Sequence, residues 1–241
     1  MEQETFRLAL EIGGDNWCMA WVIDLPGCFI NRPSAQEAMD DTPEEIRDYL
    51  RWLQQHGEDM EGPERITVEV AETVTSRGTA ERGMTRAFLS SDQERMTHQQ
   101  LATLFRRLHY SRQDLLELLN TVPQSAWIWQ PDKREKLIST YYPTIKDQVQ
   151  HIALAERWYI QKLWPVPRFS PAKTPVERLE KVRQFVVNTL SEHAVLDSSK
   201  MVEVDGQNWT VRKVLRRLLY HEPYHFHQIQ AILNQYTAYA H

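Results

Sequence analysis

The chain has 241 residues, of which 41% are hydrophobic and 25% are charged, a composition typical of globular proteins. It contains no apolar run of about 18 residues, so we expect no membrane span, and its acidic N-terminus lacks the apolar core of a secretion signal. The chain has only two cysteines, which favours a reducing, cytoplasmic location. Its net charge of −5 does not indicate binding to nucleic acid.

The charge is unevenly distributed along the chain. Residues 1–80 carry 17 acidic and 6 basic side chains, whereas residues 81–241 carry 16 acidic and 22 basic ones. A change of this size indicates either two units of different origin or a drift in composition between two domains.

Residues 1–76 have the pattern of a small α+β domain. Ser34 and Glu37 form a capping-box pattern that predicts a helix over 35–55, and Pro43 inside it predicts a kink or a restart. Runs of alternating or continuous apolar residues predict strands at 6–12, 17–24, 28–30 and 66–72. We therefore expect an antiparallel sheet with one helix packed on it.

Three short motifs in this region resemble those of HicB-like antitoxin domains. They are the turn Asp24-Leu25-Pro26-Gly27-Cys28, the helix start Glu37-Ala38, and Tyr49-Leu50 near the helix end. The resemblance covers residues 5–75 and implies the same fold and, as in antitoxins, a small protein partner. The chain shows no ribbon–helix–helix or helix-turn-helix pattern, so we expect the fold rather than the antitoxin function to be shared.

Residues 77–96 are rich in serine, threonine, glycine and arginine, which predicts a linker. After it, apolar residues recur at helical spacing through 97–241. The pattern predicts helices over roughly 98–120, 144–165, 175–190 and 211–233, with caps at Thr97, Thr174 and Thr210. Asp205-Gly206-Gln207 predicts a turn before the last helix. Amphipathic helices joined by one long connection predict an all-α four-helix bundle, a fold whose core commonly holds metal sites.

Three histidines of this region are candidate metal ligands. His221 and His225 lie four residues apart, which places both imidazoles on one face of a helix. His151 lies among apolar residues of the second predicted helix, which can face the fourth helix of a bundle. A lone histidine there is more often a hydrogen-bonded core residue, but the pair favours a metal site. Three imidazoles suit zinc first, with nickel or iron as alternatives, and leave open the coordination position of a catalytic site.

The same residues carry a second resemblance, to the DinB/YfiT-like superfamily of metal-dependent bundles. It covers residues 97–235 and rests on Trp209-Thr210, on the stretch from His221 to Gln228, and on the stretch from Ile145 to Tyr159. The resemblance implies that His151, His221 and His225 form a metal triad. It also implies a metal-dependent S-transferase or hydrolase that uses a low-molecular-weight thiol, acts on a small molecule and forms a homodimer.

Residues 221–225 also match the His-Glu-x-x-His motif of zinc proteases, in which the glutamate is the general base. That interpretation needs a downstream third ligand, but none of the 16 residues after His225 is Asp or Glu. Pro223 inside the motif is a further objection. We therefore prefer the DinB-like interpretation, in which Glu222 is either an acid or base near the metal or a solvated helix residue.

Two aromatic residues, Trp158 and Tyr224, are expected to line a substrate pocket beside the histidines. For the whole chain, the alternative to an enzyme is a non-catalytic binding or regulatory protein. Its metal would then be structural, and its HicB-like domain would bind another protein or a second copy of the chain.

Overall fold

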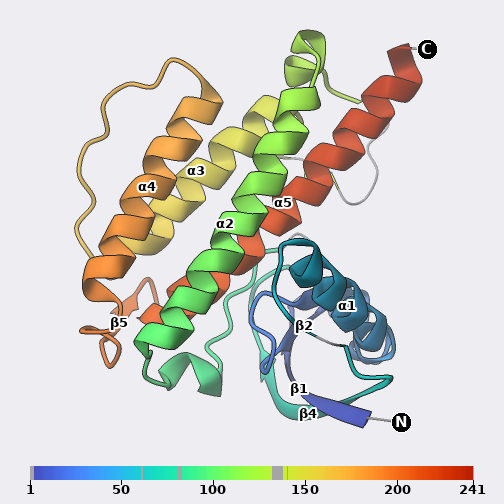
Figure 1. Cartoon of the computed structure of the whole chain (residues 1–241), viewed down its shortest axis with the longest axis vertical. Coiled ribbons are helices and arrows are strands. Elements are labelled where there is room, and N and C mark those ends of the chain that lie inside the picture. The colour runs from blue at the N-terminus through green and yellow to red at the C-terminus, as the bar shows by residue number, and fades with distance from the viewer. Residues whose placement is uncertain (1–2, 61, 81–82, 132–137, 140, 241) are drawn as a thin grey trace. The chain divides into compact units, whose positions relative to one another are not determined.

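The computed structural model describes residues 3–60, 62–80, 83–131, 138–139 and 141–240 (Figure 1). The chain divides into two compact units, residues 1–94 with 205–208 and residues 95–204 with 209–241. The boundary between residues 94 and 95 falls inside the segment 77–96 that was predicted as a linker. No helix in the described part of the chain combines the length and the apolar character that a membrane span requires.

The first unit contains a four-stranded sheet and one long helix, as expected for an α+β domain. Its elements are β1 (Gln3–Ile12), β2 (Cys18–Val22), β3 (Phe29–Arg32), α1 (Ala35–Gln55), β4 (Arg65–Thr75) and the short 3-10 helix η2 (Ser90–Gln93). The strand order is β3-β2-β1-β4. Each predicted strand and the helix are present, although β1 and β4 are longer than predicted.

The sheet is mixed, so the prediction of an antiparallel sheet is wrong for one pair of strands. β1 pairs with β2 and β2 pairs with β3 in antiparallel fashion, but β1 pairs with β4 in parallel, with Phe6 opposite Val68. The reason is the crossover: α1 carries the chain back along the sheet, so β4 runs in the direction of β3, which is also the direction of β1. Local patterning does not contain this information.

Helix α1 begins at its predicted cap and is continuous. The Oγ atom of Ser34 accepts a hydrogen bond from the backbone N–H of Glu37 at 3.2 Å. The helix continues through Pro43 without a restart, and the hydroxyl of Thr42 donates to the carbonyl of Ala38 at 2.5 Å. This side-chain hydrogen bond lies directly before the proline, and the helix keeps its full predicted length.

Part of the segment predicted as a linker packs against the sheet of the first unit. Glu11 is fully buried, and its Oε1 accepts backbone hydrogen bonds from Arg86 at 2.6 Å and Ala87 at 3.0 Å. The carbonyl of Gly78 accepts a hydrogen bond from Gly14 N at 2.8 Å. A buried carboxylate that collects backbone N–H groups holds a segment whose composition alone resembles a flexible connection.

The second unit is helical, as predicted. Its elements are α2 (His98–Thr121), the 3-10 helix η3 (Gln124–Ile128), α3 (Ile145–Gln161), α4 (Pro175–His193), the strand β5 (Met201–Val204) and α5 (Val211–Ala240). The strand β6 (Gln207–Thr210) is divided between the two units, because residues 205–208 are grouped with the first. The turn predicted at Asp205-Gly206 joins β5 to β6, and both of its residues have positive φ, as a tight hairpin requires. The two short strands themselves were not predicted.

Threonine side chains cap all four long helices of this unit, and three of these caps, at Thr97, Thr174 and Thr210, were predicted. Thr210 accepts a hydrogen bond from Lys213 N at 3.2 Å at the start of α5. Thr97, Thr144 and Thr174 each accept a hydrogen bond from the backbone N–H three residues later. These caps fix where α2, α3 and α4 begin. The start of α3 in turn sets the face of the helix on which each following side chain lies.

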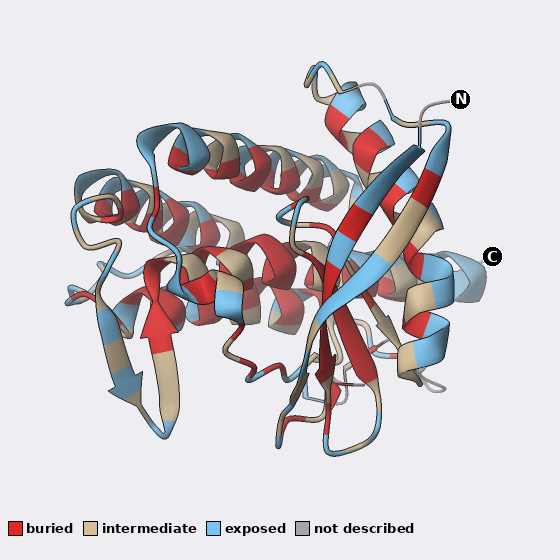
Figure 2. Cartoon of the chain, turned by 90° about the horizontal axis from the view of Figure 1, so that it is seen from below, coloured by how far each residue is buried: buried red, intermediate tan, exposed pale blue. Residues whose placement is uncertain are grey.

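Helix α3 packs against α4 and α5, and α2 packs against α5 (Figure 1). Helices α2, α3 and α4 each have a buried and an exposed side, whereas α5 has no exposed residue from Val211 to Phe226 (Figure 2). Leu115, Val149, Val186 and Leu215, one from each of α2 to α5, are fully buried in the apolar core. Because α3 and α5 are neighbours, polar residues on their facing sides meet inside the unit.

Candidate metal centre

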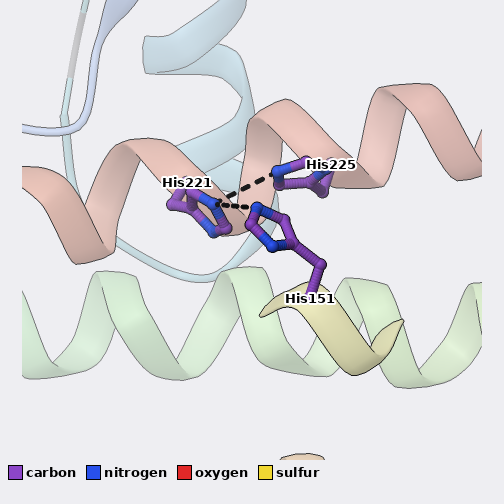
Figure 3. A group of neighbouring side chains, drawn as sticks. All are labelled: His151, His221 and His225. Atoms are coloured by element: carbon purple, nitrogen blue, oxygen red, sulfur yellow. Dashed lines mark hydrogen bonds between the residues drawn. The ribbon is translucent and has the colours of Figure 1, made fainter. Parts of the chain in front are cut away.

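Three histidine side chains from two helices converge inside the helical unit (Figure 3). His151 lies on α3, and His221 and His225 lie one turn apart on α5. The Nε2 atom of His221 is 3.1 Å from that of His151 and 3.2 Å from that of His225. One donor nitrogen from each residue lies within 4.8 Å of the other two. The structure thus brings together the three residues that the sequence predicts as ligands.

The donor set fits a single divalent ion. Histidine nitrogens bind zinc at about 2.0–2.1 Å, so two of them around a tetrahedral ion lie roughly 3.3 Å apart. The separations of 3.1 and 3.2 Å are close to this value. Within the described part of the chain the cluster consists of the three histidines, with no carboxylate or thiol. Three protein ligands leave at least one coordination position for another molecule.

Burial lowers the pKa of all three imidazoles. The pKa of His151 falls to about 4. For His221, burial is the largest cause, and the neighbouring His225 and His151 lower the pKa further. Burial and the proximity of His151 act in the same way on the pKa of His225. The imidazoles are therefore neutral near pH 7, and a metal ion does not have to displace protons from them.

Gln148 holds His225, and Gln228 in turn holds Gln148. The Nδ1 atom of His225 lies 2.5 Å from Oε1 of Gln148, which precedes His151 by three residues on α3. The Nε2 atom of Gln148 donates to Oε1 of Gln228 at 2.9 Å. Both glutamines are fully buried or nearly so, at 0% and 1% exposure. These contacts leave Nε2 of His225 facing the other histidines.

Aromatic rings surround the imidazoles. Tyr142 stacks on His151 with ring centroids 3.7 Å apart and an interplanar angle of 17°. Tyr159 lies edge-on to His221 at 5.7 Å. Burial and the nearby Tyr159 raise the pKa of Tyr142, so its phenol remains protonated at neutral pH. The rings give the cluster an apolar wall on these sides.

The two residues predicted to line a pocket differ in position. Tyr224 lies edge-on to His225, with ring centroids 5.4 Å apart. Trp158 is 43% exposed and packs edge-on against Tyr159 and Trp209. Tyr224 therefore adjoins the cluster directly, whereas Trp158 reaches it through Tyr159. Pocket lining stays a prediction for both residues.

Glu222 lies beside His221 in the sequence but points into a buried set of charges. Its Oε2 accepts a hydrogen bond from Arg112 Nε at 2.8 Å, and its Oε1 accepts one from Ser111 Oγ at 2.9 Å. Arg183 Nη2 lies 3.1 Å from the same Oε2. Although burial opposes ionisation, the two arginines hold the pKa of Glu222 below its ordinary value. The interpretation of Glu222 as a solvated helix residue is therefore wrong, because tertiary contacts bury it.

Glu156 on α3 completes this set of charges. Its Oε1 lies 2.7 Å from Arg112 Nη2 and 2.5 Å from Arg183 Nη2. We call Arg112, Glu156, Arg183 and Glu222 the charge cluster; its members come from α2, α3, α4 and α5, one from each. Two arginines and two glutamates balance in charge, which allows four ionised groups to be buried together.

The sequence predictions did not include Tyr142, Gln148 or Tyr159 as neighbours of the histidines. A signal for Gln148 exists, because side chains three residues apart share a helix face and Gln148 precedes His151 by three. Gln228 follows His225 by three and was noted only as part of the family motif. A glutamine three residues from a candidate metal ligand can therefore be used to predict a residue that hydrogen-bonds to a ligand.

The fold and the site of this unit define a class of protein. In this class a helical domain has a cluster of histidines in its core, and two of them lie one turn apart on its last described helix. The family model of the DinB superfamily matches residues 107–229, just over half of the 241-residue chain. The chain therefore belongs to the DinB superfamily, whose domains often bind metal.

The matched region contains the three histidines and the whole charge cluster. It does not extend into the first unit, so the HicB-like identity of residues 1–76 stays a prediction. Comparisons with curated proteins and with solved structures gave no match.

Proposed function

We propose that this protein is a metal-dependent enzyme in which His151, His221 and His225 hold one divalent ion, with zinc as the first candidate and nickel or iron as alternatives. The observation that carries the proposal is the convergence of three Nε2 atoms, with separations of 3.1 and 3.2 Å, inside the family match. The resemblance to thiol-dependent members suggests S-transfer or hydrolysis on a small molecule, with a low-molecular-weight thiol as co-substrate.

The chemistry that a divalent ion supplies at such a site is Lewis acidity, which lowers the pKa of a water or a thiol toward neutrality. The chain itself provides neutral nitrogen donors, because burial lowers the pKa of each histidine. Tyr142 and Tyr159 limit the access of water to the imidazoles, since their rings lie against His151 and His221. In this proposal Glu222 anchors α5 and does not exchange protons with substrate, because both of its oxygens are occupied.

A structural metal in a non-catalytic protein is the alternative. A structural zinc site has four protein ligands. Among the residues that the structure describes, the cluster contains three. This count supports an open and reactive site. The HicB-like domain would then be an accessory to the enzyme, through its mixed sheet and single helix.

The proposal is tested by assaying the full chain, loaded with zinc, nickel or iron, for ester and amide hydrolysis and for transfer of glutathione, bacillithiol or mycothiol. We expect activity that is lost on chelation and in His151→Ala, with the unfolding curve showing that the variant remains folded. His227→Ala is the matched control, because His227 is exposed on the same helix as two of the ligands. Catalysis that is unchanged in His151→Ala would overturn the proposal.

A further inference from the structure

We infer that Gln148 and Gln228 form an amide relay that fixes the tautomer of His225 before metal binds, so that Nε2 of His225 is the metal-binding atom. The inference rests on the proposed metal site and adds two positioning residues to it. Each group in the relay is oriented by a neighbour that can only donate or only accept a hydrogen bond.

The relay begins at Gln228. The backbone N–H of Ser139 lies 3.1 Å from one end of the Gln228 side-chain amide. A backbone N–H can only donate, so the amide atom opposite it must be the oxygen, Oε1. An unambiguous backbone group thus fixes the orientation of this side chain.

Two acceptors then fix the orientation of Gln148. One end of its amide lies 2.6 Å from the backbone carbonyl oxygen of Tyr142 and 2.9 Å from Oε1 of Gln228. Both of these oxygens can only accept, so the end of Gln148 that faces them is the NH₂ group. The opposite orientation would place an oxygen against two oxygens inside a buried site.

The remaining end of Gln148 is therefore Oε1, which lies 2.5 Å from Nδ1 of His225. An amide oxygen accepts, so the proton of the neutral His225 ring must lie on Nδ1. The lone pair is then on Nε2, which is the atom 3.2 Å from Nε2 of His221. The relay selects the tautomer that a metal ion needs.

The relay connects the same two helices that carry the ligands. Gln148 and His151 lie on α3, while His225 and Gln228 lie on α5. By contrast, Nδ1 of His221 is buried and makes no hydrogen bond to a described residue. His225 is thus the pre-organised ligand of the pair on α5, and a partner-fixed tautomer increases its basicity toward a metal.

The direct test is the tautomer of His225 in the metal-free full chain, measured at pH 7 by two-bond ¹H–¹⁵N correlation on protein with ¹⁵N-labelled histidine. We expect protonated Nδ1 and unprotonated Nε2 in the wild type. In Gln148→Leu we expect that preference to disappear and zinc affinity to fall roughly 10- to 100-fold. Gln150→Leu, on the same helix, is the matched control and should change neither quantity.

A second variant separates the tautomer from packing. Gln148→Glu loses the two donor contacts but keeps an oxygen opposite His225, so we expect it to retain the Nδ1–H tautomer that Gln148→Leu loses. Protonated Nε2 in the wild type would overturn the inference, even if Gln148→Leu failed to fold. So would unchanged zinc affinity in a folded Gln148→Leu.

These outcomes can be separated from failure of the proposed function. A wild type that binds none of zinc, nickel or iron contradicts the metal site, whereas the tautomer of its His225 remains measurable. If Gln148→Leu binds zinc as tightly as the wild type does, the relay is contradicted but the metal site is not.

Discussion

His221 and Glu222 are neighbours in the sequence and have opposite roles in the core of the helical unit. Successive residues of a helix point about 100° apart, so one side chain faces the histidines and the next faces the charge cluster. His221 is neutral because burial lowers its pKa, whereas Glu222 is ionised because Arg112 and Arg183 lower its pKa against burial. The identity of nearby charges, and not burial alone, decides the ionisation state of each.

The first prediction concerns the charge cluster. Replacing Glu222 by Gln leaves the positive charges of Arg112 and Arg183 balanced by a single carboxylate inside the core. We expect the free energy of unfolding to fall by about 3–5 kcal/mol, as when one partner of a buried ion pair is removed. Urea unfolding measures this change.

The control for this prediction is Glu192→Gln, because the side chain of Glu192 is 74% exposed. That variant should stay within about 0.5 kcal/mol of the wild type. A loss below about 1 kcal/mol in Glu222→Gln would mean that the cluster does not depend on this charge. The anchoring role of Glu222 would then be wrong.

The second prediction is the pH dependence of the metal-free protein. In the unfolded chain a histidine has a pKa of about 6.5, whereas the pKa of His151 in the folded protein is about 4. Between these values the unfolded state binds more protons, so the free energy of unfolding falls as the pH falls from 6.5 to 4. Each such histidine contributes up to about 1.4 kcal/mol per pH unit.

Urea unfolding with a chelator present, at a series of pH values, measures this dependence. His151→Gln removes one of the titrating groups, so its curve should be less steep than that of the wild type across the same range. Equal slopes for the two proteins would show that His151 titrates with an ordinary pKa and is not desolvated.

At the scale of helices, α3 carries both a predicted ligand, His151, and the proposed relay residue Gln148, and its first turn is fixed by Thr144. The Oγ1 atom of Thr144 accepts from the N–H of Asp147 at 3.1 Å and donates to its carboxylate at 2.6 Å. Helix α4 has an equivalent cap in Thr174, which accepts from Glu177 N at 3.0 Å. The two caps are alike in chemistry, but no predicted ligand lies on α4.

The third prediction uses this pair of caps. Thr144→Ala and Thr174→Ala should each lower the free energy of unfolding by about 1 kcal/mol. Only Thr144→Ala should also weaken metal binding, by up to about fivefold, because fraying of α3 loosens Gln148 and His151. Calorimetric titration with zinc measures the affinities. An equal or larger loss of affinity in Thr174→Ala would contradict the idea that α3 transmits the effect.

Helix positions were predictable because their signals are local. Threonine caps, the apolar period and the spacing of His221 and His225 are all contained within a few residues, and the structure confirms each of them. The spacing also places both imidazoles on one helix face without any knowledge of the tertiary structure. The choice of His151 as their neighbour needed the superfamily resemblance as well.

Features that depend on the arrangement of whole elements were not predictable in the same way. The parallel pairing of β4 with β1 follows from the path of α1 across the sheet, and the alternating pattern of β4 is the same for either direction. The charge cluster combines four residues that are far apart in sequence, each of which would ordinarily be assigned to a helix surface. The ordering of residues 86–87 depends on one buried glutamate in β1.

At the scale of the whole molecule, the chain combines a mixed-sheet unit with a helical DinB superfamily unit. The three histidines and the charge cluster lie within the helical unit. The three histidines provide neutral nitrogen donors in its core. The charge cluster connects α2, α3, α4 and α5 through buried ion pairs. We infer that the proposed metal site depends on the helical unit for its geometry.

The measurement that tests the central claim most directly is the metal content of the full chain purified without chelator, determined by elemental analysis for the wild type and for His221→Ala. We expect about one equivalent of zinc, nickel or iron in the wild type and none in the variant, since Nε2 of His221 lies close to Nε2 of both other histidines. A wild type that holds no metal, even after reconstitution with each of these ions, would contradict the account and make the three histidines core residues without a ligand.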